Sequence, residues 1–532
     1  MDTKPTDLKT AGHDSLAPVH WAALLGVAAA VAVLHLLTNG RYGFHRDELQ
    51  TLYDARHLEL GFIAYPPFTP FVEHIGVALF GLSLVGLRLF SVLAQTAGIV
   101  VTGLMAHELG GKRLAQFTAS LAVALSPLPL FEGTEFQYTT FDYLWWVLIA
   151  YLTIRLLRSD DPRWWLAIGA AVGVGLLTKY SIVFFVAGVL AGAAFTRARR
   201  FFKSPWFWAG IALALAIFLP NFLWQARHDF ISYRFLQYIH ARDVQLGRDD
   251  GFLINQFFIC INLFATPLAI AGLVSFLRSS RYRMLAWMYL VPLELLFIGN
   301  GRDYYLAAAY PMLLAMGAVA GERWAAASAR LSPSAQKKLR KGHAPKSRRG
   351  ASGLGRRVAV GVFFTGLAAC GAAACAIILP LQSTGPLRDF ALAKNNNLQE
   401  EFGWNDLIKT VAGVRDSLTP AQQASLGVMV GNYGELGAVE ILGPQYHLPP
   451  PISLVNSAWL RGYPTPPPTT LIVVGLSRQA VDQVFTSCQL AGHNANSEGV
   501  SNEESLSHPD IFVCGPPILP WPDFWKQYQG FG

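Results

Sequence analysis

Apolar stretches close to the length of a membrane-spanning helix recur along this chain, and they restrict its fold more than any other feature. A helix needs about 20 predominantly apolar residues to cross a bilayer. Only 14% of the 532 residues are charged, whereas soluble domains average about 25%. The sequence therefore predicts a polytopic α-helical membrane protein with eleven transmembrane helices. Its expected spans are 21–38, 88–106, 114–131, 137–156, 164–179, 181–196, 205–224, 252–276, 284–299, 303–321 and 358–380.

Basic residues divide the predicted loops into two classes. They are concentrated in segments 4–9, 112–113, 155–163, 197–203, 278–283 and 337–357. Cytoplasmic loops carry such an excess of Lys and Arg, which puts the amino terminus in the cytoplasm and the chain beyond residue 382 outside. The net charge of +8 thus reflects membrane topology and does not indicate a nucleic-acid partner.

Two segments are assigned to the cytoplasmic side by the same reasoning. The polar segment 1–20 is too long for the charged region of a cleavable signal peptide, so we expect a cytoplasmic stub and a retained first helix. The segment 322–357 is basic and rich in Ser, Ala and Gly. We expect it to be a disordered linker that is attracted to anionic membrane lipids.

The predicted outer loops contain further helical patterns. Within the first outer loop, residues 39–87, Asp47–Leu60 and Phe71–Leu82 have apolar residues at helical spacing. Both are too short to cross a bilayer, which predicts interfacial helices. The second outer loop, Gln225–Gly251, is rich in charged and aromatic residues, and we expect another interfacial helix there.

From about residue 384 the composition becomes that of a soluble domain. Its short apolar runs predict buried strands at Leu426–Val430, Leu471–Val474 and Ile511–Val513, and helices at Trp404–Ser417 and Arg478–Phe485. Residues 384–532 are therefore expected to form a small C-terminal α/β domain on the outer face. An oxidising compartment favours a disulfide between Cys488 and Cys514, and two independent thiols are the alternative.

Ionisable side chains collect on the outer side of the predicted bundle. The densest group, His45–Glu48, directly follows the first span, and Asp142, Lys179 and Arg302 lie at outer ends of later spans. Burying such a group at helix depth costs about 3 kcal/mol. Each of these side chains therefore needs a compensating partner or has a function. Simpler readings are that Asp47 caps a helix and that Lys179 reaches toward the interface.

A second motif in the first outer loop is Tyr65-Pro66-Pro67-Phe68. Its two prolines lack backbone donors and stiffen the chain. Two interpretations are open, a support for a bound donor and a rigid turn without a ligand contact.

With these motifs the chain resembles the C-type glycosyltransferase superfamily. It is similar to the dolichyl-phosphate-mannose–protein mannosyltransferases of glycosyltransferase family 39 and to the bacterial aminoarabinose transferases of lipid A. The likeness covers roughly residues 20–380, with a glycosyltransferase module at 21–321 and a last span at 358–380. The matching motifs are Asp47-Glu48, Tyr65-Pro66-Pro67, Thr140–Tyr143, Leu176–Lys179, Arg302–Leu306 and Tyr310-Pro311.

The resemblance implies transfer of a hexose or pentose from a polyprenyl-phosphate donor to an acceptor lipid, glycan or protein. The reaction would take place at the outer face of a bacterial inner membrane. Since a lipid phosphate is a good leaving group, the chemistry needs one general base, and cations on the phosphate. We expect Asp47 to be that base, with inversion at the anomeric carbon, and Glu48 to position the loop or the acceptor.

The resemblance also suggests substrate contacts around a cavity at the outer membrane boundary. Lys179 and Arg302 are expected on the phosphate, and Asp142 on the acceptor or on a cation. Further candidates are Tyr65, His45, Arg46, Arg56, His57 and His228. Some related enzymes use a divalent metal, and this sequence shows no dense ligand set that would specify one.

Other protein classes explain the sequence less well. A transporter or flippase of a lipid-linked or anionic substrate typically has repeated halves and polar residues near the bilayer midplane. No internal repeat is evident here, and the ionisable groups favour one side. A scaffold that presents the outer domain would leave Asp47, Asp142, Lys179 and Arg302 without a role.

Overall fold

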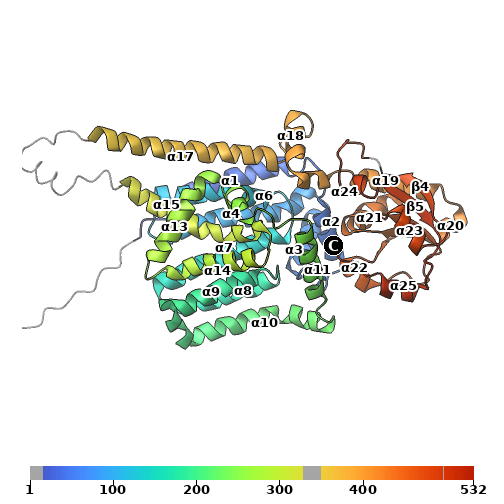
Figure 1. Ribbon diagram of the computed structural model, residues 1–532, viewed down its shortest axis with the longest axis horizontal. Coiled ribbons are helices and arrows are strands. Elements are labelled where there is room, and N and C mark those ends of the chain that lie inside the picture. Colours follow the sequence, from blue (N-terminus) through green and yellow to red (C-terminus); the bar gives the residue numbers. More distant parts are fainter. Residues whose placement is uncertain (1–15, 327–348, 495) are drawn as a thin grey trace, which may run out of the picture.

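The computed structural model describes residues 16–326, 349–494 and 496–532. A bundle of helices forms the larger part of the protein, and a small sheet with short helices forms the other end (Figure 1). The predictions for residues 1–15 of the stub and for residues 327–348 of the linker lie outside the described residues.

The bundle contains helical structure at every predicted span. Its elements are α1 (Trp21–Thr38), α4 (Leu84–Glu108), α5 (Arg113–Ala124), α6 (Pro127–Phe131), α7 (Tyr138–Ser159), α8 (Trp164–Leu176), α9 (Ile182–Phe195), η1 (Arg197–Lys203), α10 (Pro205–Arg227), α12 (Phe252–Asn255), η2 (Gln256–Cys260), η3 (Leu263–Ala265), α13 (Thr266–Arg278), α14 (Arg283–Ile298), η4 (Asp303–Ala309), α15 (Tyr310–Ala326) and α17 (Arg349–Ile378). The ends of the predicted linker are therefore helical, because α15 continues to Ala326 and α17 begins at Arg349.

Fewer helices are long enough to cross a bilayer on their own than the sequence predicts. By length and composition, six of the described helices could do so, or eight if each of two bent pairs is one span. The helices α8 and α9 are short because the turn between Leu176 and Ile182 separates them. The protein is thus a mostly helical chain with several apolar helices.

The span predicted at 252–276 is wrong as a single straight helix. The chain bends by 101° between Phe252–Cys260 and Leu263–Arg278. At the bend, the buried amide of Asn262 donates to the carbonyls of Leu125 and Leu367, at 2.9 and 3.0 Å. A buried polar side chain needs such partners, and here they hold the break in place.

Three further helices lie at the end of the bundle next to the sheet. They are α2 (Arg46–Arg56) and α3 (Phe68–Phe80) in the first outer loop, and α11 (Ile231–Gln245) in the second. The expected helices are therefore present, although α2 ends before Leu60. Figure 1 shows these helices between the bundle and the sheet.

The C-terminal sheet has five strands in the order β2-β1-β3-β5-β4. The strand β1 (Leu426–Val430) is parallel to β2 (Pro451–Ser453) and to β3 (Thr470–Val474). The strand β5 (Asp510–Cys514) is antiparallel to β3 and to β4 (Gln489–His493). The three predicted strands are thus present, whereas β2 is very short and the exposed β4 lacks an apolar run.

The chain beyond residue 384 also forms short helices. They are α18 (Pro386–Lys394), η5 (Asn396–Glu401), α19 (Trp404–Asp416), α20 (Pro420–Ala424), α21 (Tyr433–Leu442), η6 (Gly443–Tyr446), α22 (Asn456–Arg461), α23 (Arg478–Val484), α24 (Glu503–Leu506) and α25 (Trp521–Gln527). Of these, α19, α21, α22 and α23 contact the strands, whereas α18 packs on α17. The predicted helices correspond to α19 and α23. Cys488 and Cys514 are joined by a disulfide, as one of the two alternatives predicted.

The first outer loop shares a hydrophobic core with the sheet. Leu49 and Tyr53 of α2 belong to one buried cluster with Val428 of β1 and Ile472 of β3. A Cβ atom at Gly437 of α21 would collide with the backbone of Leu49. The chain beyond residue 384 therefore packs directly on the loop that carries the candidate base.

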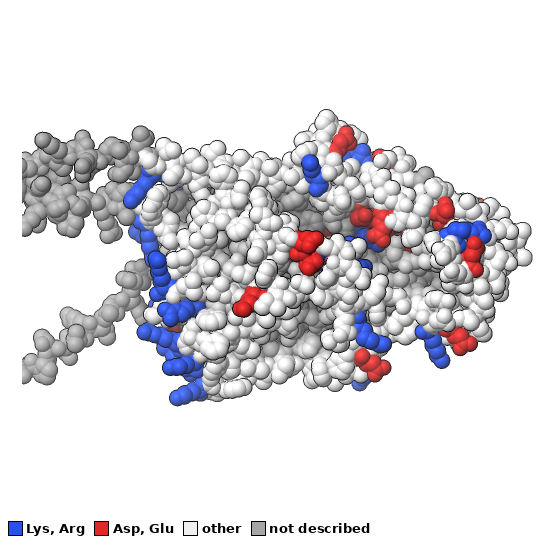
Figure 2. Space-filling model, viewed as in Figure 1, with Lys and Arg blue, Asp and Glu red and all other residues white. Residues whose placement is uncertain are grey.

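Charge is distributed unevenly between the two ends of the protein. Figure 2 shows Lys and Arg gathered on the end of the bundle farthest from the sheet, whereas acidic and basic side chains are mixed near the sheet. This arrangement agrees with the predicted topology, in which the basic loops share one side of the membrane.

Candidate active site

The helix α2 begins with a capping box. The Nδ1 atom of His45 accepts from the backbone N–H of Asp47 at 3.2 Å, and Glu48 Oε2 accepts from the backbone N–H of His45 at 2.8 Å. Asp47 therefore lies in the first turn of α2, and the simpler reading of Asp47 as its N-cap is wrong. Burial lowers the pKa of His45, which favours the neutral form that accepts this hydrogen bond.

Glu48 is buried and fully engaged. Arg88 donates to it twice, from Nε at 2.8 Å and from Nη2 at 2.7 Å. The backbone N–H of Phe136 donates to Oε1 at 2.8 Å. With no oxygen available for a substrate, Glu48 holds the loop in place.

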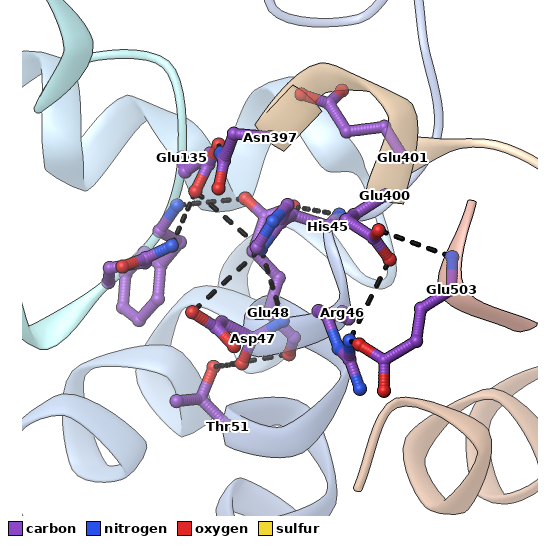
Figure 3. A network of polar contacts seen from close by, with 12 residues as sticks. His45, Arg46, Asp47, Glu48, Thr51, Glu135, Asn397, Glu400, Glu401 and Glu503 are labelled. Atoms are coloured by element: carbon purple, nitrogen blue, oxygen red, sulfur yellow. Dashed lines mark hydrogen bonds and ion pairs between the residues drawn. The ribbon is translucent and has the colours of Figure 1, made fainter. Parts of the chain in front are cut away.

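Asp47, in contrast, keeps an accessible carboxylate. Its side chain is 32% exposed, against 2% for Glu48. Figure 3 shows the Asp47 and Glu48 side chains on the same turn of α2, below His45. Of the two acidic residues of the motif, only Asp47 has the accessibility that a general base needs.

Tyrosine side chains lie between Asp47 and the two predicted phosphate-binding cations, Lys179 and Arg302. Tyr138, the first residue of α7, is within electrostatic reach of Asp47 and of Arg302. The Nζ atom of Lys179 is 5.3 Å from the centre of the Tyr138 ring and 4.0 Å from that of Tyr305. Lys179 and Arg302 thus share one polar cluster through Tyr304, and Asp47 lies close enough to act electrostatically on Tyr138 at its edge.

Asp142 lies on the bundle side of this cluster. It accepts hydrogen bonds from the Trp146 indole at 3.1 Å and from the Ser181 hydroxyl at 3.0 Å. The positive charge of Lys179 also acts on this carboxylate. Asp142 is therefore buried with hydrogen-bond donors and an opposite charge nearby, as a buried ionisable group requires.

Arg302 already has a carboxylate partner. Its Nε and Nη2 atoms donate to Asp243 of α11 at 2.7 and 2.8 Å, and Nη1 donates to the Tyr304 hydroxyl at 3.2 Å. Burial opposes ionisation of Asp243, but the hydrogen bonds and charge of Arg302 outweigh it and lower the pKa of the carboxyl. This two-point pairing fixes the guanidinium group and ties α11 to the cluster.

Arg46 points away from this cluster and into the C-terminal region. It pairs with Glu503, and its Nη atoms lie 3.8 Å from Glu400 and 3.9 Å from Glu504. Figure 3 shows Arg46 turned toward Glu503 and Glu400. Its charge is thus neutralised by carboxylates of the chain itself.

The other sequence candidates contact the protein elsewhere. Tyr65 donates to Asp54 at 2.8 Å, although its ring is also 5.5 Å from that of Tyr138. Arg56 donates to the backbone and side chain of Glu440, and His57 bonds the Tyr53 carbonyl. His228 stacks on Trp224 at 4.0 Å. The structure therefore brings Tyr65 to the edge of the cluster but not Arg56, His57 or His228.

Several members of the site have no clear signal in the sequence. Arg88, Tyr138, Asp243, Glu401 and Tyr433 come from five different elements. Arg88 alone has a recognisable pattern, a cation within the first residues of an apolar span. The others become visible only through contacts between distant segments.

The sequence left a metal site open and predicted a cavity beside Asp47. Within the residues that the structure describes, no group of three His, Cys, Asp or Glu side chains is placed to hold a metal ion. A groove of about 930 Å³ runs between α1 and α5, lined by Ala22–Leu34 and Lys112–Leu125, and does not involve Asp47. The cavity expected beside Asp47 stays a prediction.

Comparisons with known proteins agree on the kind of fold. Residues 64–224 match the family described as dolichyl-phosphate-mannose-protein mannosyltransferase. The crystal structure of ArnT from Cupriavidus metallidurans bound to undecaprenyl phosphate superposes with a TM-score of 0.52 at 16% identity. That match covers 93% of this chain and 98% of ArnT.

Two curated relatives come from Rhizobium johnstonii. The lipid A galacturonosyltransferase RgtD is 27% identical over 254 residues, 46% of this chain and 53% of RgtD. The lipopolysaccharide core galacturonosyltransferase RgtB is 25% identical over 198 residues, 37% of this chain and 40% of RgtB. The matches thus span about half the length of these relatives or less. The family match, the relatives and the shared fold together confirm the resemblance of this chain to the C-type glycosyltransferases.

Proposed function

We propose that this protein is a membrane glycosyltransferase that moves a sugar from a polyprenyl-phosphate carrier to an acceptor on the extracytoplasmic face. The names of its relatives, which act on lipid A and on the lipopolysaccharide core, favour an envelope lipid or glycan as the acceptor. The observation that carries the proposal is the polar cluster of Lys179 and Arg302, with Asp47 within electrostatic reach of Tyr138 at its edge.

In the proposed reaction Asp47 is the general base. It takes the proton of the acceptor hydroxyl while that oxygen bonds to the anomeric carbon from the side opposite the phosphate. The bond between the anomeric carbon and the phosphate oxygen breaks, and polyprenyl phosphate leaves with the electron pair. The sugar is transferred with inversion. General base catalysis of this kind contributes about 10²- to 10⁴-fold.

The leaving phosphate is proposed to lie near Lys179 and Arg302. The Lys179 ammonium is surrounded by the rings of Tyr138, Tyr304 and Tyr305, whose faces favour a cation. Arg302 is held by Asp243 and therefore needs little reorganisation to meet a developing negative charge. Both cations act on the same end of the bundle as the base.

The proposed topology places this cluster outside the cytoplasm of a bacterial inner membrane. We propose eleven crossings, a cytoplasmic amino terminus and a C-terminal domain on the outer face. The concentration of Lys and Arg at the opposite end of the bundle supports this orientation (Figure 2). The shorter helices, such as α8 and α9, would then cross as part of the packed bundle.

The direct test uses purified full-length protein in lipid nanodiscs with a synthetic polyprenyl-phosphate sugar that is radiolabelled in the sugar. Envelope lipid extracts supply the acceptor, and mass spectrometry identifies the product. We expect release of polyprenyl phosphate together with a labelled acceptor. Movement of an intact fluorescent donor between leaflets without cleavage would instead indicate a flippase and would contradict the proposal.

A further inference from the structure

The segment Gly431–Glu435 follows β1 and has no role in the reaction so far. Asn432 Oδ1 accepts from the backbone N–H of Glu435 at 2.9 Å, and Glu435 Oε2 accepts from the N–H groups of Gly431 and Asn432 at 3.0 and 3.3 Å. This capping box makes Tyr433 the first residue of α21 and fixes its direction.

Two glycines allow α21 to lie directly against α2. A Cβ atom at Gly434 would meet the Trp404 ring at 2.7 Å and Arg46 Cβ at 3.1 Å. At Gly437 a Cβ atom would collide with the Leu49 backbone. Only glycine permits so close an approach of two backbones, and this approach brings the start of α21 to the first turn of α2.

Tyr433 contacts both residues that follow the His45 cap. The Arg46 guanidinium lies 4.7 Å from the centre of the Tyr433 ring. The carboxylate of Asp47, the next residue along α2, is close enough to act on the Tyr433 phenol electrostatically. Burial, and then the negative charge of Asp47, raise the pKa of the phenol, so that it is a neutral donor.

Resting on the proposed function, we propose that Tyr433 is a positioning residue for Asp47, supplied to the active site by the C-terminal domain. Its hydroxyl holds one carboxylate oxygen of Asp47, which leaves the other oxygen for the acceptor. The carboxylates around Arg46 tie α2 to η5 and α24 of the same domain, so the phenol is correctly placed only while the domain is docked.

The variant Tyr433→Phe separates this role from packing. It keeps the ring over Arg46 and removes only the hydroxyl. Because a hydrogen bond to a charged group contributes about 1.5–3 kcal/mol, we expect kcat to fall about 10-fold or more, with the KM for the donor unchanged. The acid limb of the pH–kcat profile should move to higher pH, because the ionised carboxylate loses a donor.

Tyr463→Phe is the matched control, since Tyr463 packs against Trp521 and Trp525 on the far side of the sheet. Thermal unfolding of each variant checks the fold. If Tyr433→Phe unfolds, 3-fluorotyrosine at position 433 keeps the ring and hydroxyl, and its stronger donation should shift the acid limb to lower pH.

The outcomes distinguish this proposal from the proposed function. Wild-type protein without any sugar transfer would overturn the function itself. Wild-type transfer together with a Tyr433→Phe rate and pH profile equal to those of Tyr463→Phe would overturn only the role of Tyr433. For the fluorinated protein, an unshifted pH profile would overturn that role as well.

Discussion

The Glu401 carboxylate lies 3.3 Å from the Arg88 guanidinium, although 313 positions separate the two residues in the sequence. Arg88 also binds Glu48 and the Asn39 carbonyl. The backbone carbonyl of Glu401 accepts from Gly43 at 3.1 Å. One buried cation thus joins α4, the loop that carries Asp47 and the beginning of the C-terminal domain.

Loss of Arg88 should therefore destabilise the protein strongly. In Arg88→Met, the carboxylates of Glu48 and Glu401 stay buried without their cation, which typically costs about 3–5 kcal/mol. We expect a clear fall in the thermal unfolding midpoint measured in detergent. The control is Arg200→Met, because the Arg200–Asp160 pair is exposed and such pairs contribute about 0–1 kcal/mol. Equal midpoints for the two variants would contradict this account of Arg88.

The pH dependence of stability should depend on Glu435. Burial, and then the neighbouring Glu504 charge, raise the pKa of Glu435 from its ordinary 4.5 to about 8, despite the backbone donors that it binds. The native state therefore holds a proton that the unfolded state releases. This contribution to stability is complete below about pH 4.5 and is lost as the pH rises through about 8.

The predicted fall of stability with rising pH is tested by the thermal unfolding midpoints of wild type and Glu435→Gln, measured from pH 5 to 8. The wild-type midpoint should fall as the pH rises, and the variant should fall less, because the amide does not ionise. Glu400 and Glu401, whose pKa values are each raised to about 7, contribute to the remaining slope, as does Glu504, whose pKa burial also raises. Asp389→Asn, at an exposed position of α18, is the control and should follow wild type. Parallel curves for wild type and Glu435→Gln would refute the prediction.

Lys179→Met should weaken binding of the donor phosphate. The substitution removes a cation that is surrounded by three tyrosine rings and keeps much of the side-chain volume. We expect the dissociation constant for polyprenyl phosphate, measured calorimetrically in nanodiscs, to rise about 10-fold or more. Lys409→Met, on the exposed face of α19, should bind like wild type. Unchanged affinity in Lys179→Met would exclude Lys179 from the phosphate site.

Local sequence patterns were sufficient to predict the features that depend on a single segment of the chain. Apolar runs located the bundle helices and the strands β1, β3 and β5. Asp47, Asp142, Lys179 and Arg302 could be placed on one side because topology follows from the charge of the loops. The bend at Asn262 was missed, since an apolar run does not show which carbonyl groups a buried amide will meet.

Contacts between distant segments could not be predicted in this way. The partners of Arg46 lie in η5 and α24, and the partner of Arg302 lies in α11. A free arginine and an arginine already paired with a carboxylate look the same in sequence. The same holds for Tyr433, which approaches Asp47 only because Gly434 and Gly437 let α21 dock on α2.

The most direct test of the account is the rate of sugar transfer by Asp47→Asn, which removes the base and keeps the shape of the side chain. The account predicts a fall in kcat of about 10²- to 10⁴-fold, with unchanged donor binding and an unchanged unfolding midpoint. Asp389→Asn should transfer sugar at the wild-type rate. Transfer by Asp47→Asn within a few-fold of wild type would show that Asp47 is not the base.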